Sequence, residues 1–228
     1  MQAWLAKLHQ TFIETGYWRQ MFVGLQNTVS ITLGALCIGI AVGALLAIIK
    51  YFAEESPALA PAGKLCDLYI TVIRGVPVMV LLLVFFFVVF AGTRNKLGVC
   101  ILAFGLNSGA YVAEIIRGGI MSIDNGQFEA GRSLGFNYLQ TMWFVVLPQV
   151  VKNVLPSLMN EFIALLKETS VAGYVAVMDL TKAGDTIRGR TYSPFMPLIA
   201  VALIYLALVM VLTAIVGRVE RRLRSSDH

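Results

Sequence analysis

The sequence predicts an all-α integral membrane protein, because of its composition and the spacing of its charges. Of its 228 residues, 58% are hydrophobic and 14% are charged, whereas soluble domains are typically about 45–50% apolar and about 25% charged. Lipid offers no partner for free backbone groups, and the chain lacks the alternating pattern of barrel strands, so we expect helical spans within one domain. Four charge-free stretches near or above the roughly 20 residues that a spanning helix needs lie between Arg19 and Lys50, Arg74 and Arg94, Lys96 and Glu114, and Arg190 and Arg218.

The N-terminal segment, residues 1–19, has the pattern of an amphipathic helix on a membrane surface. Trp4, Leu8 and Phe12 recur at intervals of four residues, while polar side chains face away. A frayed terminus is the alternative interpretation. The membrane domain is expected to occupy residues 20–217, and a basic tail residues 218–228.

We expect the first span from about Met21 to Ile49. Its small residues Gly34, Gly39 and Gly43 recur at helical spacing, which would let a neighbouring helix approach closely. A proline-containing loop with two glutamates follows at 51–63, and it predicts a connection on the solvent side.

The second span is expected from about residue 64 to residue 92. The run Arg74-Gly75-Val76-Pro77 predicts a break in this helix close to one membrane face. The third span is expected from Lys96 to about Ile120.

The polar loop 122–149 is predicted to hold two short helices. Asp124 or Asn125 can cap the first, Gly135 ends it, and Asn137 can cap the second. Residues 133–151 carry no charge but are amphipathic, so we expect part of this stretch to lie along the interface. The fourth span is then centred on 150–166 and bent at Pro156.

The remainder comprises a semi-polar surface or re-entrant segment at 169–190, a last span at 192–216, and the tail. About five spans place the two termini on opposite sides of the membrane. The excess of Lys and Arg on one side is weak and rests largely on the tail, but it favours a cytoplasmic C-terminus and an external N-terminus. The tail arginines are Arg218, Arg221, Arg222 and Arg224.

The fourth span carries polar and ionisable side chains, which are rare in lipid and indicate a functional site by default. Glu161 and Glu168 share one helix face, and Asn160 and Lys167 share an adjoining one. Hydroxyls, a cation and carboxylates suit both ends of a zwitterion. Snorkelling of Lys167 and Glu168, or a structural pair of Glu161 with Lys167, are alternatives. The candidate substrate-path residues here are Asn160, Glu161, Lys167, Glu168 and Ser170.

A second polar stripe lies on the third span. Asn107, Tyr111 and Glu114 follow one helical side, and Glu114 can neutralise Arg117 at the i, i+3 spacing. Hydrogen bonding between helices is the favoured interpretation, and Asn107 and Tyr111 remain substrate-path candidates.

The sequence gives no support for catalysis, a metal site or nucleic-acid binding. Both histidines are near the termini, the three cysteines are isolated, and no phosphate loop or metal-ligand spacing occurs. Anionic lipid is the expected partner of the basic tail.

The loop from Glu129 to Pro148 carries the pattern E-A-G-x3-G-x9-V-x-L-P. It resembles the signature loop of permease subunits of ATP-binding-cassette (ABC) importers, in which alanine is usual where Gly131 stands. The runs SGAYVAEIIRGGI (108–120), LKETSV (166–171) and VERRLR (219–224) are similar to the polar amino-acid branch, which takes up histidine, glutamine and arginine.

The resemblance implies a type I importer fold with about five transmembrane helices and a cytoplasmic coupling helix, in the bacterial inner membrane. It implies a second permease subunit, identical or not, an ATP-binding subunit dimer that holds ATP and magnesium, and an extracytoplasmic binding protein. By resemblance, polar residues of the fourth span would line the path. The charge of Glu161 suits the side chain of a cationic amino acid, and it suits equally the α-ammonium that every amino acid carries. The coupling residues carried over are Glu129, Ala130, Gly131, Arg132 and Gly135.

Three other functions stay open at this stage. They are an importer of the same type for another small solute, an ATP-independent channel or carrier, and a membrane scaffold without transport. A channel or carrier would not need a docking helix, and a scaffold would not explain the polar fourth span.

Overall fold

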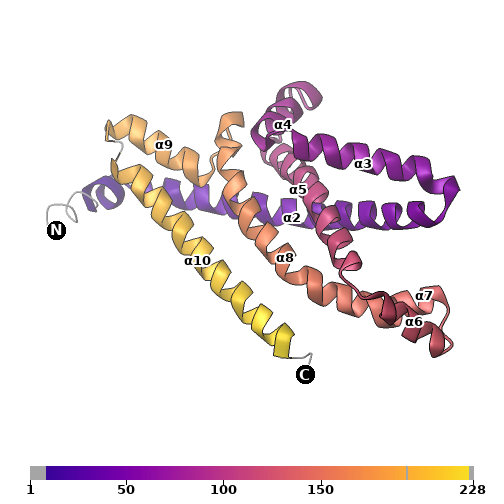
Figure 1. Ribbon diagram of the computed structural model, residues 1–228. Helices are drawn as coiled ribbons and strands as arrows, with labels where there is room; N and C mark the ends of the chain where they lie inside the picture. The colour runs from indigo at the N-terminus through magenta and orange to yellow at the C-terminus, as the bar shows by residue number, and fades with distance from the viewer. Residues whose placement is uncertain (1–8, 194, 226–228) are drawn as a thin grey trace. The chain divides into compact units, whose positions relative to one another are not determined.

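The computed structural model describes residues 9–193 and 195–225, and every element in them is helical (Figure 1). Short 3-10 and π-helical turns join the α-helices. The α-helices are α2 (Tyr17–Glu55), α3 (Ala60–Gly75), α4 (Val78–Val84), α5 (Lys96–Met121), α6 (Asn125–Ser133), α7 (Tyr138–Thr141), α8 (Leu147–Glu168), α9 (Leu180–Thr191) and α10 (Phe195–Ser225). The shorter turns are η1 (His9–Glu14), η2 (Pro57–Leu59), η3 (Phe85–Val89), η4 (Met142–Val146) and η5 (Thr169–Val175).

Within residues 9–193 and 195–225, four helical segments are long and apolar enough to cross a membrane. A fifth span results if Pro57–Gly75 and Val78–Val89 are counted as one broken span, which agrees with the predicted number of about five. The four continuous segments are Tyr17–Glu54, Lys96–Met121, Tyr138–Val175 and Phe195–Leu223.

The predicted helix break at the Arg-Gly-Val-Pro run is confirmed. Helix α3 ends at Gly75, Pro77 occupies the cap position, and α4 begins at Val78. Proline lacks the backbone N–H that would bond to the preceding turn, and it disfavours helical backbone in the residue before it.

The fourth span belongs to a helical segment that begins earlier in the chain than expected. The prediction centred this span on residues 150–166. Tyr138–Val175 forms one apolar helical segment that includes a π-helical turn at Met142–Val146. Pro156 lies inside α8. The cap at Asn137 starts the helix, and no later residue stops it before Glu168. Whether its first part lies along the interface stays a prediction.

The N-terminal prediction falls partly outside the described residues, because the first eight are not among them. Within the described part, His9–Glu14 forms a π-helical turn and α2 already begins at Tyr17. The amphipathic surface helix therefore stays a prediction.

The chain divides into two compact units. The first consists of Met1–Cys37, Val76–Gly105 and Ile163–Leu212, and the second of Ile38–Gly75, Leu106–Phe162 and Thr213–His228. In the first unit, one core is built around Ile31, Leu82, Phe104 and Leu165, and another around Leu180 and Ile187. In the second unit, the core comprises Ile123, Val146, Val150 and Val154.

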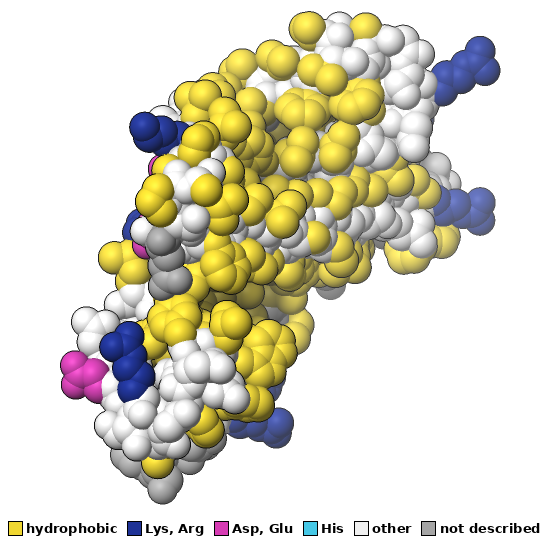
Figure 2. All heavy atoms as spheres, turned by 90° about the vertical axis from the view of Figure 1, so that its right-hand side faces the viewer, with side chains coloured by type: hydrophobic (Ala, Val, Ile, Leu, Met, Phe, Trp, Pro, Cys, Tyr) yellow, Lys and Arg dark blue, Asp and Glu magenta, His cyan; other side chains and the backbone are white. Residues whose placement is uncertain are grey.

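Large hydrophobic side chains are also abundant on the surface. Figure 2 shows them spread over much of the face in view, with few charged groups among them. On α10, Leu203, Leu206 and Met210 are each more than half exposed. A soluble protein rarely exposes so much contiguous apolar surface, so this surface suits lipid or another membrane subunit.

Candidate functional site

Helix α6 is defined by the capping residues that its sequence predicts. The Asp124 carboxylate accepts a hydrogen bond from the Gly126 amide at 2.7 Å. The helix ends at Ser133, and Gly135 follows with φ +84°, a conformation that glycine adopts readily. At Asn137 the side chain accepts from the Gln140 amide, and the Gln140 side chain accepts from the Asn137 amide, each at 2.9 Å. Both predicted caps and the predicted glycine stop are confirmed.

The five predicted coupling residues divide between the surface and the interior. Glu129, Ala130, Arg132 and Gly135 are exposed, whereas Gly131 is buried. A Cβ atom on Gly131 would lie within 3.0 Å of three side-chain atoms of Thr141. Helix α6 therefore rests on α7 through Gly131 and presents a short charged face to the outside.

Side chains also join the N-terminal end of α6 and the residues before it to α8. The Gln149 amide donates to the Gln127 side chain at 3.0 Å. The Asn153 amide donates to the Ser122 hydroxyl, also at 3.0 Å. Phe128 packs against the core that contains Val146 and Val150. The sequence predicted the helix, but these long-range fastenings were missed, because single amides carry no sequence signal.

Glu161, a substrate-path candidate on α8, is held by the third span. The Ser108 hydroxyl donates to its carboxylate at 2.8 Å, and Ser108 is fully buried. Asn107 is 2% exposed, while Asn160 is exposed. The structure therefore brings Glu161 to the polar side of α5, and it identifies Ser108 as a direct partner.

Tyr111, which is also on α5, belongs to a charged cluster. The Arg74 guanidinium stacks 5.2 Å from the centre of the Tyr111 ring, and its Nη1 is 3.9 Å from the Glu114 carboxylate. Glu114 also accepts from Arg117 at 2.9 Å, as the i, i+3 spacing predicts, and it lies 3.5 Å from Lys50.

Lys50 in turn pairs with Asp67 at 2.6 Å. The cluster joins α2, α3 and α5, which supports the structural interpretation of the α5 stripe. Lys50, Asp67 and Arg74 were missed as members, since charges on separate helices have no fixed spacing in sequence.

Lys167 and Ser170 line a small cavity of about 280 Å³ in the first unit. The other lining residues are Thr181, Val201 and Tyr205, and the Thr181 and Tyr205 hydroxyls lie 3.4 Å apart. Glu168 is half-buried and is not among the lining residues. One ammonium group and three hydroxyls therefore border this cavity. Thr181 and Tyr205 come from α9 and α10, and no local pattern in the sequence pairs them with Lys167.

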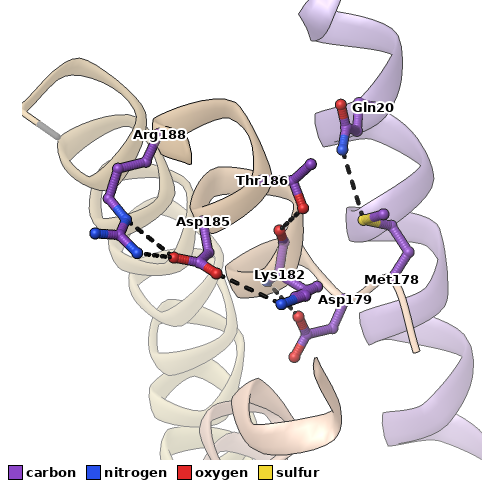
Figure 3. Close-up of polar contacts among 7 residues, drawn as sticks. All are labelled: Gln20, Met178, Asp179, Lys182, Asp185, Thr186 and Arg188. Carbon is purple, nitrogen blue, oxygen red and sulfur yellow. Dashed lines mark hydrogen bonds and ion pairs between the residues drawn. The ribbon is translucent and has the colours of Figure 1, made fainter. Parts of the chain in front are cut away.

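Helix α9 carries a further polar cluster (Figure 3). Asp185 lies between Arg188, whose Nε donates to it at 2.9 Å, and Lys182, whose Nζ lies 3.5 Å away. The hydrogen bond from Arg188 keeps the pKa of the Asp185 carboxyl below its usual range.

Asp179 behaves differently from Asp185. Its carboxylate caps α9 by accepting from the Lys182 amide, and its side chain is fully buried. Burial raises the pKa of this carboxyl from 3.8 to about 6, although hydrogen bonds from backbone amides oppose the shift.

Residues 39–225 match the family described as binding-protein-dependent transport system inner membrane component. This chain belongs to that family. It is therefore a multi-pass membrane protein and a permease subunit of a transport system.

Two relatives in the family show how far the similarity extends. The arginine transport system permease protein ArtQ of Bacillus subtilis (strain 168) is 36% identical over 211 residues, covering 90% of this chain and 92% of ArtQ. The putative glutamine transport system permease protein GlnP of Rickettsia bellii (strain RML369-C) is 35% identical over 203 residues, covering 88% of this chain and 91% of GlnP.

Solved structures of permeases share the fold. The crystal structure of an amino acid ABC transporter with histidines matches with a TM-score of 0.84 and 37% identity, covering 92% of this chain and 96% of that one. The methionine transporter MetNI in an inward-facing conformation matches in fold, with a TM-score of 0.76 and 19% identity, over 90% of this chain and 97% of that one. The permease has the transmembrane fold of type I importers.

Proposed function

We propose that this permease forms the translocation path for a polar amino acid in an ATP-driven importer and couples to a separate ATPase subunit through α6. The observation that carries the proposal is the exposed face of α6, where Glu129, Ala130 and Arg132 face outward from a chain that is otherwise largely apolar. A carboxylate beside small residues can enter a cleft and bind an arginine of a partner. The names of the relatives support an amino acid as the substrate.

The coupling would be mechanical. The ATPase subunits would bind ATP and magnesium, close, and move α6 together with the helices to which it is fastened. Two conformations, open to opposite sides of the membrane, would then alternate. A second permease subunit and an extracytoplasmic binding protein would complete the importer, with the C-terminus in the cytoplasm and the N-terminus outside.

The test is reconstitution of the permease with its ATPase and binding protein in proteoliposomes. Glu129→Ala is expected to lower both ATPase stimulation and amino-acid import, because a charge-assisted contact is lost. Glu129→Gln keeps the size and hydrogen-bonding capacity and should be affected less. Equal membrane insertion of all three proteins is the control, and normal import by Glu129→Ala would contradict the proposal.

Two separate places are candidate substrate contacts, Glu161 in the second unit and the cavity at Lys167 in the first. The Glu161 carboxylate, oriented by Ser108, would bind a cationic group of the amino acid. The Lys167 ammonium and the hydroxyls of Ser170, Thr181 and Tyr205 suit a carboxylate. The α-ammonium of any amino acid fits Glu161, and a cationic side chain fits it as well.

Glu161→Gln separates these two possibilities. If Glu161 binds a cationic side chain, import of L-arginine should fall by at least about tenfold relative to L-glutamine, since hydrogen bonds to charged groups contribute most. Ser108→Ala keeps the charge and should cause a smaller fall. An unchanged ratio of arginine to glutamine import in Glu161→Gln would rule out the side-chain role.

A further inference from the structure

Three aromatic rings from three elements form a stack, and two of them belong to the polar loop 122–149. The Tyr138 ring on α7 is 6.1 Å from Phe128 on α6, with an interplanar angle of 18°. It is 6.3 Å from Tyr51 on α2, with an interplanar angle of 12°. These separations lie in the range of favourable aromatic pairs. All three residues belong to the second unit, so α6 has a side-chain connection to the first span.

The two ends of this ring stack are anchored in different places. Phe128 packs against the core formed by Ile123, Val146, Val150 and Val154. Tyr51 makes a second, edge-on contact with Phe52 at 5.7 Å. Its hydroxyl is buried and has no hydrogen-bond partner within the described part of the chain. Because burying an unpaired hydroxyl is unfavourable, ring contacts rather than the hydroxyl hold Tyr51 in position.

Two rings of the stack, Tyr51 and Tyr138, border an apolar cavity. This cavity of about 630 Å³ is lined by Tyr51 and Phe52 from α2 and by Tyr138 and Leu139 from α7. Open space therefore borders the place where the rings join α2 to α7. In a densely packed interior, the movement of one element is passed to its neighbour through many contacts. Beside this cavity there are fewer such contacts, so a larger share of the movement passes through the rings.

We propose that Phe128, Tyr138 and Tyr51 are positioning residues that pass the movement of α6 to the first span during transport. The proposal rests on the proposed function, in which an ATPase docks on α6. Stacked rings resist sliding and separation, so the end of α2 follows α6 when the ATPase closes. Within the second unit, the part of α2 that carries Tyr51 runs without a break from Ile38 to Glu55.

The test measures import and ATP hydrolysis together in proteoliposomes that hold the complete complex and its binding protein, with radiolabelled L-arginine and L-glutamine as probes. Tyr51→Leu keeps an apolar side chain but removes the ring. It is expected to lower the amount imported per ATP by at least about threefold, the effect of losing one aromatic pair. Co-purification with the ATPase and basal hydrolysis should stay normal, because the α6 face is unchanged.

Further variants separate the ring stack from general packing. Tyr51→Phe keeps the ring and should import normally. Tyr138→Leu and Phe128→Leu should each match Tyr51→Leu, and the Tyr51→Leu/Tyr138→Leu pair should be no worse than either change alone, because both break one connection. Phe136→Leu is the matched control, since Phe136 pairs with Phe144 at 6.2 Å in the same loop and lies outside the ring stack.

Normal import per ATP in Tyr51→Leu would overturn the proposal, and so would an equal loss in Phe136→Leu. A wild-type chain that binds no ATPase subunit would overturn the proposed function and this role with it. If the wild type couples import to ATP hydrolysis and Tyr51→Leu imports the same amount per ATP, only the role of the ring stack is overturned.

Discussion

Gly131 occupies a position where the signature loop of ABC importer permeases usually has alanine. The residue that faces it, Thr141, explains why glycine fits here. Thr141 is 1% exposed, and its hydroxyl donates to the Asn137 carbonyl at 3.1 Å. Its branched side chain occupies the space that a methyl group on Gly131 would need. The glycine and the threonine therefore act as a matched pair between α6 and α7.

Gly131→Ala is expected to destabilise the protein by about 1–3 kcal/mol, the usual cost of overpacking. Adding Thr141→Ala should recover part of that loss, since the added methyl group then has room. Thermal unfolding in detergent measures both effects. A Gly131→Ala protein as stable as the wild type would show that Thr141 moves aside without cost.

Asp179 should make stability depend on pH. Its folded pKa of about 6 lies above the usual 3.8, so the folded protein binds this proton more tightly than the unfolded chain does. Its contribution is greatest below about pH 4 and is lost as the pH rises through 6. The shift corresponds to on the order of 3 kcal/mol.

Asp179→Asn should remove this dependence, because asparagine also caps helices but does not ionise. Above pH 6 the variant is expected to be more stable than the wild type. The measurement is the midpoint of thermal unfolding from pH 4 to pH 8. Parallel curves for the two proteins would contradict the prediction.

Residue-level prediction from sequence succeeded where the partners are close along the chain. The caps at Asp124 and Asn137 and the pair Glu114–Arg117 depend on spacings of two to four residues, which a helix fixes. Ser108 and Glu161 are 53 residues apart. Their contact depends on how α5 and α8 pack, which no local pattern encodes.

At the scale of the elements, the regularly spaced glycines of α2 let α5 pack closely against it. In the second unit, a Cβ on Gly39 would lie 2.9 Å from the Ser108 hydroxyl, and one on Gly43 would lie 2.9 Å from the Ala113 backbone nitrogen. In the first unit, Gly34 packs in the same way on Ile101. The predicted close approach of a neighbouring helix is confirmed at all three glycines.

Gly43→Ala should therefore destabilise the protein by about 1–3 kcal/mol, because the backbone of α5 cannot yield as a flexible side chain does. The matched control is Gly118→Ala on α5, where a Cβ meets nothing within 4 Å. That change should be neutral or stabilising, since alanine favours helix by about 1 kcal/mol over glycine. Thermal unfolding of the purified permease compares them, and equal effects would show that contact with α5 is not the cause.

The start of the fourth span shows the limit of prediction for elements. Residues 133–151 combine an apolar majority with Asn137, Gln140 and Gln149, and this pattern suits a surface helix or the start of a span equally well. In the structure, the Gln140 and Gln149 amides form side-chain hydrogen bonds. With these polar groups hydrogen-bonded, the helical segment runs from Tyr138 to Val175 without a break near residue 150, where the polar residues had suggested the start of the span.

For the whole molecule, the fold class, the number of spans and the family followed from charge-free stretches and one loop pattern. Both are local properties of the sequence, so they can be read without coordinates. The proposed substrate-path residues are different, because their neighbours come from distant parts of the chain. Ser108 donates to Glu161, and Lys167 shares a cavity with Thr181 and Tyr205. The family was therefore easier to predict than the residues that contact the substrate.

The unequal burial of the spans has a consequence for how the protein is made. The last span has a mean hydropathy of 2.9 and only 11% of its most apolar window is buried, whereas the third has 1.7 and 61%. A nascent last helix can enter the bilayer unaided, since lipid already satisfies its side chains. The third helix carries Asn107, Ser108 and Glu114, each costly in hydrocarbon. During biogenesis it depends on neighbouring helices to shield these groups, and it is the segment whose insertion a chaperone or an early helix pairing would assist most.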